Sequence, residues 1–104
     1  MSDFVRVAAV EELEPHGQLT RWVDDHDLLI YRLDGEIKVI SNVCRHFGGP
    51  IGWHKMRDRK FTCLWHNYVY SAEDGGCHTM PKLASRVYSS EVRDGAVWVR
   101  LTER

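Results

Sequence analysis

The stretches CRHFGGP (residues 44–50) and CLWHNY (63–68) carry the most specific pattern in this sequence of 104 residues. Each stretch places one cysteine beside one histidine, at C-x-H spacing in the first and C-x-x-H spacing in the second. Thiolates and imidazoles both bind transition metals, and turn-forming residues follow each pair. The two stretches can therefore hold one metal site, to which each loop gives one sulfur and one nitrogen.

The four candidate ligands are Cys44, His46, Cys63 and His66. A set of two cysteines and two histidines is compatible with a 2Fe–2S cluster that has both cysteines on one iron. The same set is also compatible with a single tetrahedral zinc ion in a structural module. The residue types alone do not distinguish an iron–sulfur cluster from a zinc ion.

The rest of the sequence predicts an all-β chain of perhaps 8 to 10 short strands, because no segment keeps a helical period. Asp34-Gly35 separates two β-like runs, 27–33 and 36–40, and Asp94-Gly95 separates 87–92 from 96–101. Both pairs predict tight hairpins, since a type I′ turn needs positive φ at its two central residues. Residues 4–8 form a further alternating run, and 11–17 read as a loop or a single helical turn.

Residues 42–82 differ in composition from the flanking sequence. They contain five of the eight glycines, four of the six histidines and all three cysteines. We expect a single domain over 1–104 in which 42–82 form a small inserted subdomain that binds the metal. The chain resembles the Rieske family throughout, which implies a Rieske-type (ISP-like) β-sandwich with a cluster-binding subdomain. In that family, residues at the positions of Cys44 and Cys63 bind the inner iron, and those at His46 and His66 bind the outer one.

The resemblance also indicates the redox properties. Two neutral imidazoles in place of two thiolates leave the oxidised cluster formally neutral, which raises its potential above that of plant-type ferredoxins. High-potential relatives have an extra disulfide and a serine donor, which this chain lacks, with Tyr68 at the serine position. Tyr70 can still donate a hydrogen bond to the Cys44 sulfur. We expect a potential at the low end of the roughly −150 to +300 mV Rieske range.

Other residues of this region have predicted roles around the cluster, most of them with an alternative. Trp65 either shields the cluster and docks partners or packs within its loop, and Phe47 belongs to the cover beside His46. Pro81 matches the position of the family's proline loop, against an ordinary turn. Cys77 is expected to be a loop thiol rather than a fifth ligand, with a solvated His78 after it. Surface positions are expected for the remaining histidines, His16, His26 and His54.

Composition excludes several classes of function. With a net charge of −1, the chain has no global basic field for nucleic acid, and its apolar runs are too short to cross a bilayer. Residues 1–4 show no signal peptide, and few cysteines fit the cytoplasm. Two acidic groups either steer a basic partner or form solvated faces: Glu11, Glu12 and Glu14, and Asp24, Asp25 and Asp27.

Together these features predict a soluble Rieske ferredoxin, a monomer and an electron carrier rather than an enzyme. The resemblance implies that it takes one electron from a flavin-dependent NAD(P)H reductase and passes it to a terminal oxygenase, through brief docking at the His46/His66 end. One alternative is a Rieske small subunit of a larger oxidoreductase, such as assimilatory nitrite reductase. The zinc module is the other.

Overall fold

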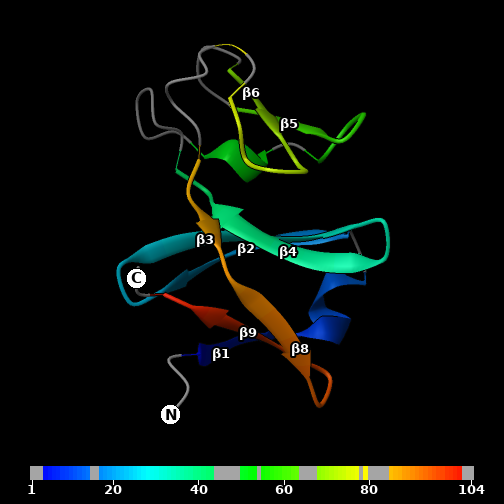
Figure 1. Cartoon of the computed structure of the whole chain (residues 1–104), viewed down its shortest axis with the longest axis vertical. Coiled ribbons are helices and arrows are strands. Elements are labelled where there is room, and N and C mark those ends of the chain that lie inside the picture. The colour runs from blue at the N-terminus through cyan, green and yellow to red at the C-terminus, as the bar shows by residue number, and fades with distance from the viewer. Residues whose placement is uncertain are drawn as a thin grey trace.

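The computed structural model describes residues 4–14, 17–43, 50–53, 55–63, 68–77, 79 and 85–101 (Figure 1). Within these ranges the chain is almost entirely β-structure, with two short 3-10 helices. In chain order the elements are β1 (Phe4–Ala9), η1 (Val10–Leu13), β2 (Gln18–Val23), β3 (His26–Leu33), β4 (Glu36–Ser41), η2 (Ile51–Trp53), β5 (Lys60–Thr62), β6 (Val69–Ser71), β7 (Val87–Tyr88), β8 (Ser90–Arg93) and β9 (Ala96–Arg100). None of the helices in the described residues is long and apolar enough to cross a membrane.

The strands form three layers (Figure 1). A four-stranded antiparallel sheet, in the order β2-β3-β4-β7, lies in the middle. A three-stranded sheet, β1-β9-β8, packs below it, and the β5-β6 pair lies above it. The all-β sandwich predicted from the sequence is confirmed.

Both predicted hairpins form at the expected residues. Asp34 and Gly35 have φ of 55° and 82°, and Asp94 and Gly95 have φ of 50° and 75°. Positive φ at both central positions turns the chain in the sense that matches the right-handed twist of the strands. The single helical turn expected within 11–17 is η1.

The run 87–92, expected to be one strand, is two. β7 pairs with β4 in the middle sheet, whereas β8 pairs with β9 in the lower sheet. The chain changes sheet between Tyr88 and Ser90, so neither sheet can use the whole run. Gln18–Val23, for which no strand was predicted, forms the edge strand β2.

Alternate side chains of β3 are buried on opposite faces of the middle sheet. Leu28 and Ile30 belong to the core shared with the lower sheet. Leu29, Tyr31 and Leu33 belong to a second core under the β5-β6 pair. Because successive side chains of a strand point to opposite faces, a sheet covered on both sides needs a continuous apolar run, as in 28–31. The middle sheet therefore packs against one core on each of its two faces.

Candidate functional site

The predicted site residues divide between described and undescribed parts of the chain. Cys63 and Tyr70 are described, and both side chains are fully buried. The other predicted site residues lie outside the described residues: Cys44, His46, His66, Phe47, Trp65 and Pro81. Within the part that is described, no three His, Cys, Asp or Glu side chains converge as metal ligands would. The described residues that border these positions form the stems of two predicted ligand loops.

The stem of the first ligand loop is held closed by backbone pairing. Val43 and Pro50, which border the segment 44–49, form an antiparallel bridge. One residue further out, the Ile51 N–H donates to the Asn42 carbonyl at 2.7 Å. The chain thus leaves the middle sheet and returns to it within a short span around the positions of Cys44 and His46.

Asn42 joins this stem to the sandwich. It is 4% exposed, and its Oδ1 accepts the Gly52 N–H at 2.7 Å. Its Nδ2 donates to both carboxylate oxygens of Asp27 at 3.3 Å, and its backbone N–H donates to the Asp27 carbonyl at 2.8 Å. Burial raises the pKa of Asp27, while the hydrogen bond from Asn42 opposes that rise. One buried side chain therefore ties together the end of β4, the start of β3 and η2.

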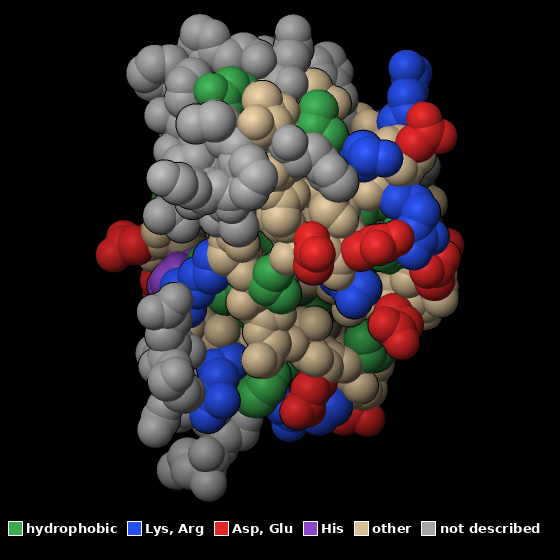
Figure 2. Space-filling model, turned by 45° about the horizontal axis from the view of Figure 1, so that its top comes forward, with side chains coloured by type: hydrophobic (Ala, Val, Ile, Leu, Met, Phe, Trp, Pro, Cys, Tyr) green, Lys and Arg blue, Asp and Glu red, His purple; other side chains and the backbone are tan. Residues whose placement is uncertain are grey.

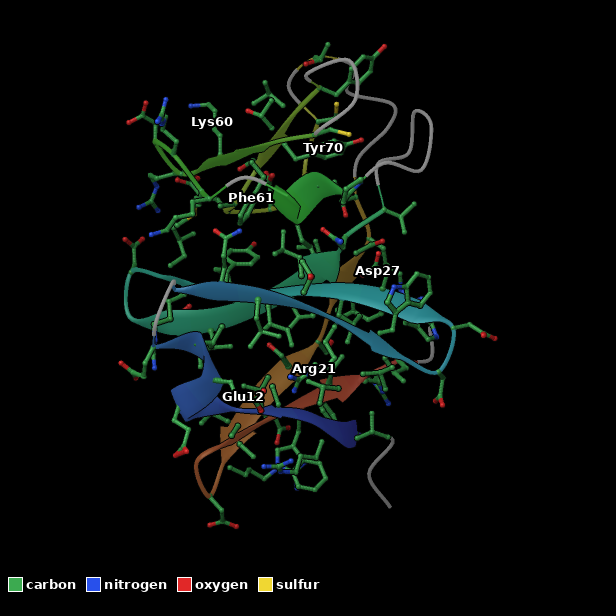
Figure 3. All side chains as sticks on the ribbon, turned by 180° about the vertical axis from the view of Figure 1, so that it is seen from behind. Glu12, Arg21, Asp27, Lys60, Phe61 and Tyr70 are labelled. Atoms are coloured by element: carbon green, nitrogen blue, oxygen red, sulfur yellow. The ribbon has the colours of Figure 1, made fainter. Side chains whose placement is uncertain are left out.

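The stem of the second ligand loop is the β5-β6 hairpin. Phe61 pairs with Tyr70 and Thr62 with Val69, and the Cys63 N–H donates to the Tyr68 carbonyl at 2.7 Å. Alternation along β5 turns Phe61 inward, where its ring meets Tyr31 of β3 edge-on at 4.9 Å between centroids. Figure 3 shows Phe61 and Tyr70 on this pair above the middle sheet.

A third segment joins the same hairpin. Tyr70 and Cys77 form an antiparallel bridge, and the Val69 N–H donates to Thr79 Oγ1 at 3.1 Å. Further along, the Ser85 hydroxyl donates to the Ser41 carbonyl at 2.9 Å. The segment that carries Pro81 therefore starts at β6 and returns to the end of β4.

These stems share one apolar core, and the thiol of Cys63 lies inside it. Ile51, Phe61, Cys63 and Tyr70 are all 0% exposed and pack in one cluster, with Met56 and Tyr68 partly buried against it. A buried thiol in a dry environment is protected from solvent, and thiolate is the ligand that iron–sulfur clusters use. The described donor and its surroundings thus fit a cluster held between the two stems.

Cys77 lies outside the named strands, as expected of a loop thiol, but it is 4% exposed and packs in the core beside Tyr70. The surface position expected for His26 is wrong, since it is half-buried, with Nδ1 3.0 Å from the Tyr88 hydroxyl. Most carboxylates of the two acidic groups are exposed, and Asp27 is half-buried. His16, His54 and His78 lie outside the described residues.

Two carboxylates of the predicted acidic groups are paired with arginines among the described residues. Glu12 pairs with Arg21, and Figure 3 shows the two side chains directed toward each other. The hydrogen bond from Arg21 lowers the pKa of Glu12 from 4.5 to about 2, helped by the bond from the Ala9 N–H. Glu14 pairs with Arg32, and Asp27 receives the Asn42 amide. Glu12 and Glu14 are thus paired at the surface, whereas the exposed Glu11, Asp24 and Asp25 form no ion pair with a described residue.

Comparison with known proteins identifies the family. The profile of the "Rieske [2Fe-2S] domain" matches residues 3–97. The chain belongs to the Rieske [2Fe-2S] family. A Rieske domain carries electrons by means of one Rieske-type 2Fe–2S cluster, so the family decides between the two metals in favour of iron and against the zinc module. The resemblance, the fold and the cofactor expected from the sequence are confirmed.

The proteins to which this chain is similar are of different kinds. It is 27% identical over 101 residues to the oxygenase component of 3-ketosteroid-9-alpha-monooxygenase from Mycobacterium tuberculosis (strain ATCC 25618 / H37Rv), covering 85% of this chain but 24% of that relative. Its fold is similar to the ferredoxin of carbazole 1,9a-dioxygenase from Nocardioides aromaticivorans IC177 (TM-score 0.84, 23% identity, 97% and 100% of the two chains). It is also similar to a protein assigned as an NADH-dependent nitrite reductase small subunit from Mycobacterium tuberculosis (TM-score 0.80, 21% identity, 97% and 96%).

Sequence reasoning found the ligand motifs but missed the residues that support them. Asn42 and Gln18 both act at the base of the first loop, and Gln18 bonds the Gly52 carbonyl at 3.3 Å and the Met56 N–H at 2.8 Å. The signal for Gln18 was a polar residue at the start of an alternating run. For Asn42 there was none, because its role depends on Asp27, which is fifteen residues away in the sequence.

Proposed function

We propose that this Rieske domain is a ferredoxin that takes one electron from a flavin-dependent NAD(P)H reductase and passes it to a terminal oxygenase. The observation that carries the proposal is the shared core, in which the buried Cys63 lies between the stems of both ligand loops. The fold similarity to a dioxygenase ferredoxin, which extends over the full length of both chains, supports the role. We further propose a monomer in the cytoplasm, which can present one end to two partners in turn.

The proposed ligands are Cys44, His46, Cys63 and His66, within a cluster-binding unit of about 42–82. When bound, the cluster supplies a one-electron redox centre. Cys63 holds it with a thiolate that Phe61 and its neighbours keep away from water. The closed stems fix the directions from which the two loops approach, and the imidazoles of the histidines are the proposed exit for the electron.

A second group of residues is proposed to surround the ligands. Tyr70 is buried in the same core as Cys63, which supports a proposed hydrogen bond from its hydroxyl to the Cys44 sulfur. A hydrogen bond to that sulfur stabilises the electron-rich reduced state and so raises the potential. Phe47, Trp65 and Pro81 are proposed as the cover of the site.

The first test is spectroscopic. The purified protein is examined by visible absorption and, after dithionite reduction, by EPR, with iron and acid-labile sulfide counted. Two irons, two sulfides and a rhombic signal of low average g are expected. Cys63→Ser and, separately, His66→Ala should change this signal, and a mock variant at the exposed Arg6 should not. A colourless protein with one zinc would contradict the ligand assignment.

The second test concerns the role. A flavin reductase with NADH should reduce the protein, which should then reoxidise when an oxygenase component with its substrate is added. The fold similarity to an assigned nitrite reductase small subunit supports the alternative of a fixed subunit in a larger oxidoreductase. Gel filtration of the native material separates the two roles: a carrier elutes alone, whereas a subunit elutes with a larger protein.

A further inference from the structure

The segment 55–60, just before β5, is the most basic part of the described chain. Its sequence, Lys-Met-Arg-Asp-Arg-Lys, has four cations and one anion in a chain whose net charge is −1. Arg57 and Lys60 exchange both backbone hydrogen bonds, at 2.9 and 3.0 Å, and Asp58 and Arg59 between them have φ of 53° and 63°. The segment is therefore a tight two-residue turn with defined geometry, despite the cost of positive φ at two non-glycine residues.

Arg59 holds this turn in place. Its Nη1 and Nη2 donate to the two carboxylate oxygens of Asp34 at 2.9 and 2.7 Å, and its Nε donates to Glu73 at 2.6 Å. Its carbonyl accepts the Ala72 N–H at 2.9 Å. A planar guanidinium that bonds two carboxylates in this way holds them in a fixed geometry, and its charge is balanced within the fold. Arg59 thus fastens the turn to the β3-β4 hairpin and to the end of β6.

The other three cations of the turn project into solvent. Lys55, Arg57 and Lys60 are exposed, and none forms an ion pair with a described residue. Figure 2 shows Lys and Arg side chains projecting at the upper right, on the side where Figure 1 places this turn, and Figure 3 shows Lys60 on the outer side of β5. Three cations against the single anion Asp58 leave an excess of positive charge on the exposed side of this fixed turn, while Arg59 is paired with Asp34 and Glu73.

A hollow lies beside these charges. It has a volume of about 550 Å³ and is lined by Lys55, Met56, Arg57 and Thr62. Met56 also packs against the core that holds Cys63, and Thr62 is the residue before Cys63. From Lys60 to Cys63 the extended strand spans about 10 Å, at roughly 3.3 Å per residue. The basic hollow therefore adjoins the stem that leads to the proposed ligand Cys63, so a partner bound there lies beside the proposed cluster-binding unit.

We propose that Lys55, Arg57, Lys60 and this hollow form a docking surface for the acidic face of the protein redox partner. The proposal rests on the proposed function. The cations attract carboxylates over a distance and accelerate encounter, and the flexible Met56 thioether offers an adaptable apolar contact once the surfaces meet. Three cations in a chain of net negative charge are few for a nucleic-acid backbone, which favours a protein partner.

The test uses the cluster-loaded protein and two kinds of probe. In NMR titrations, a hexaglutamate peptide should shift the amide signals of 55–60 in a saturable manner, and a hexalysine peptide should not. The triple variant Lys55→Gln/Arg57→Gln/Lys60→Gln should lose this binding, whereas Arg6→Gln, which removes an exposed cation of β1, should keep it. Equal binding by the triple variant, or tighter binding of a phosphodiester oligonucleotide of equal charge, would overturn the proposal.

Small oxidants test the position of the charge relative to the electron exit. The reduced protein is mixed with anionic ferricyanide or with cationic tris(phenanthroline)cobalt(III) in a stopped-flow instrument. At 0.1 M salt, the cations of the turn attract a trivalent anion and repel a trivalent cation. The triple variant should thus react more slowly with ferricyanide and faster with the cobalt complex, two rate shifts of opposite sign. Unchanged rates for both would refute the docking surface, while a failure of reductase-driven reduction alone would refute the carrier role.

Discussion

Replacing Asn42 with alanine tests whether the first ligand loop depends on the sandwich for its position. Two side-chain interactions are lost: the acceptor for the Gly52 N–H at 2.7 Å and the donor to Asp27 at 3.3 Å. The backbone bonds of Asn42 to Asp27 and Ile51 remain possible in the variant. The substitution therefore removes the side-chain link and keeps the strand.

The size of the effect follows from these two interactions. A buried donor left without a partner costs about 1 to 3 kcal/mol, and the long hydrogen bonds to the Asp27 carboxylate add about 1 kcal/mol. A loss of about 3 kcal/mol, divided by an m-value of about 1.5 kcal/mol/M in urea, lowers the unfolding midpoint by about 2 M. Because Asn42 lies two residues before Cys44, we also expect the visible absorption of the cluster to disappear at a lower urea concentration than the strand signal.

Asn42→Asp is the matched control for this prediction. It keeps an oxygen acceptor for the Gly52 N–H but places a second carboxylate against Asp27, whose pKa burial already raises. Like charges at this distance favour protonation of one carboxyl. The aspartate variant should therefore regain stability as the pH falls from 7 to 5, whereas the alanine variant should not. The assay follows far-UV circular dichroism and visible absorption in urea. An alanine variant whose midpoint falls by less than about 0.5 M would refute the proposed link.

Four further substitutions have expected outcomes. Tyr31→Phe removes the buried 2.5 Å hydrogen bond from its hydroxyl to a main-chain carbonyl, and should lower the free energy of unfolding in urea by about 1 to 3 kcal/mol. Gly52→Ala brings a Cβ within 2.6 Å of the Leu29 side chain, and should cost about 1 to 3 kcal/mol in the same assay, with partial relief by Leu29→Ala. Glu12, whose pKa is lowered to about 2, stabilises the fold above about pH 4.5 and loses this effect as the pH falls toward 2, so Glu12→Gln should show a smaller drop in Tm between pH 6 and pH 3 than the parent. Tyr70→Phe should lower the midpoint potential in a redox titration, and an unchanged potential would remove the proposed hydrogen bond.

Local patterns predicted the parts of the fold that local chemistry decides. Asp34-Gly35 and Asp94-Gly95 specify their turns through backbone conformation alone, and both turns form where expected. The continuous apolar run of β3 likewise reflects a strand buried on both faces. The ligand motifs stay a prediction from local spacing, since of the four residues only Cys63 lies in the described part of the chain.

Features that depend on distant contacts were not visible in the sequence. The break between β7 and β8 arises because β4 pairs with one part of the run and β9 with the other. The neutralisation of Glu12 depends on Arg21, which only the pairing of the sheets brings close. The acidic groups left two interpretations open, a docking face or a solvated face, and only the structure shows which of their carboxylates are paired.

The position of the middle sheet explains why a small chain can hold a metal site steadily. A pair of three-residue strands such as β5-β6 has little stability by itself. Here Phe61 packs on Tyr31, and a Cβ at Gly52 would overlap Leu29, so both ligand stems lie directly on β3. The opposite face of β3 is fixed by the lower sheet. We therefore expect movement of either stem to disturb a strand that is packed on both sides, so the two stems should stay fixed relative to each other.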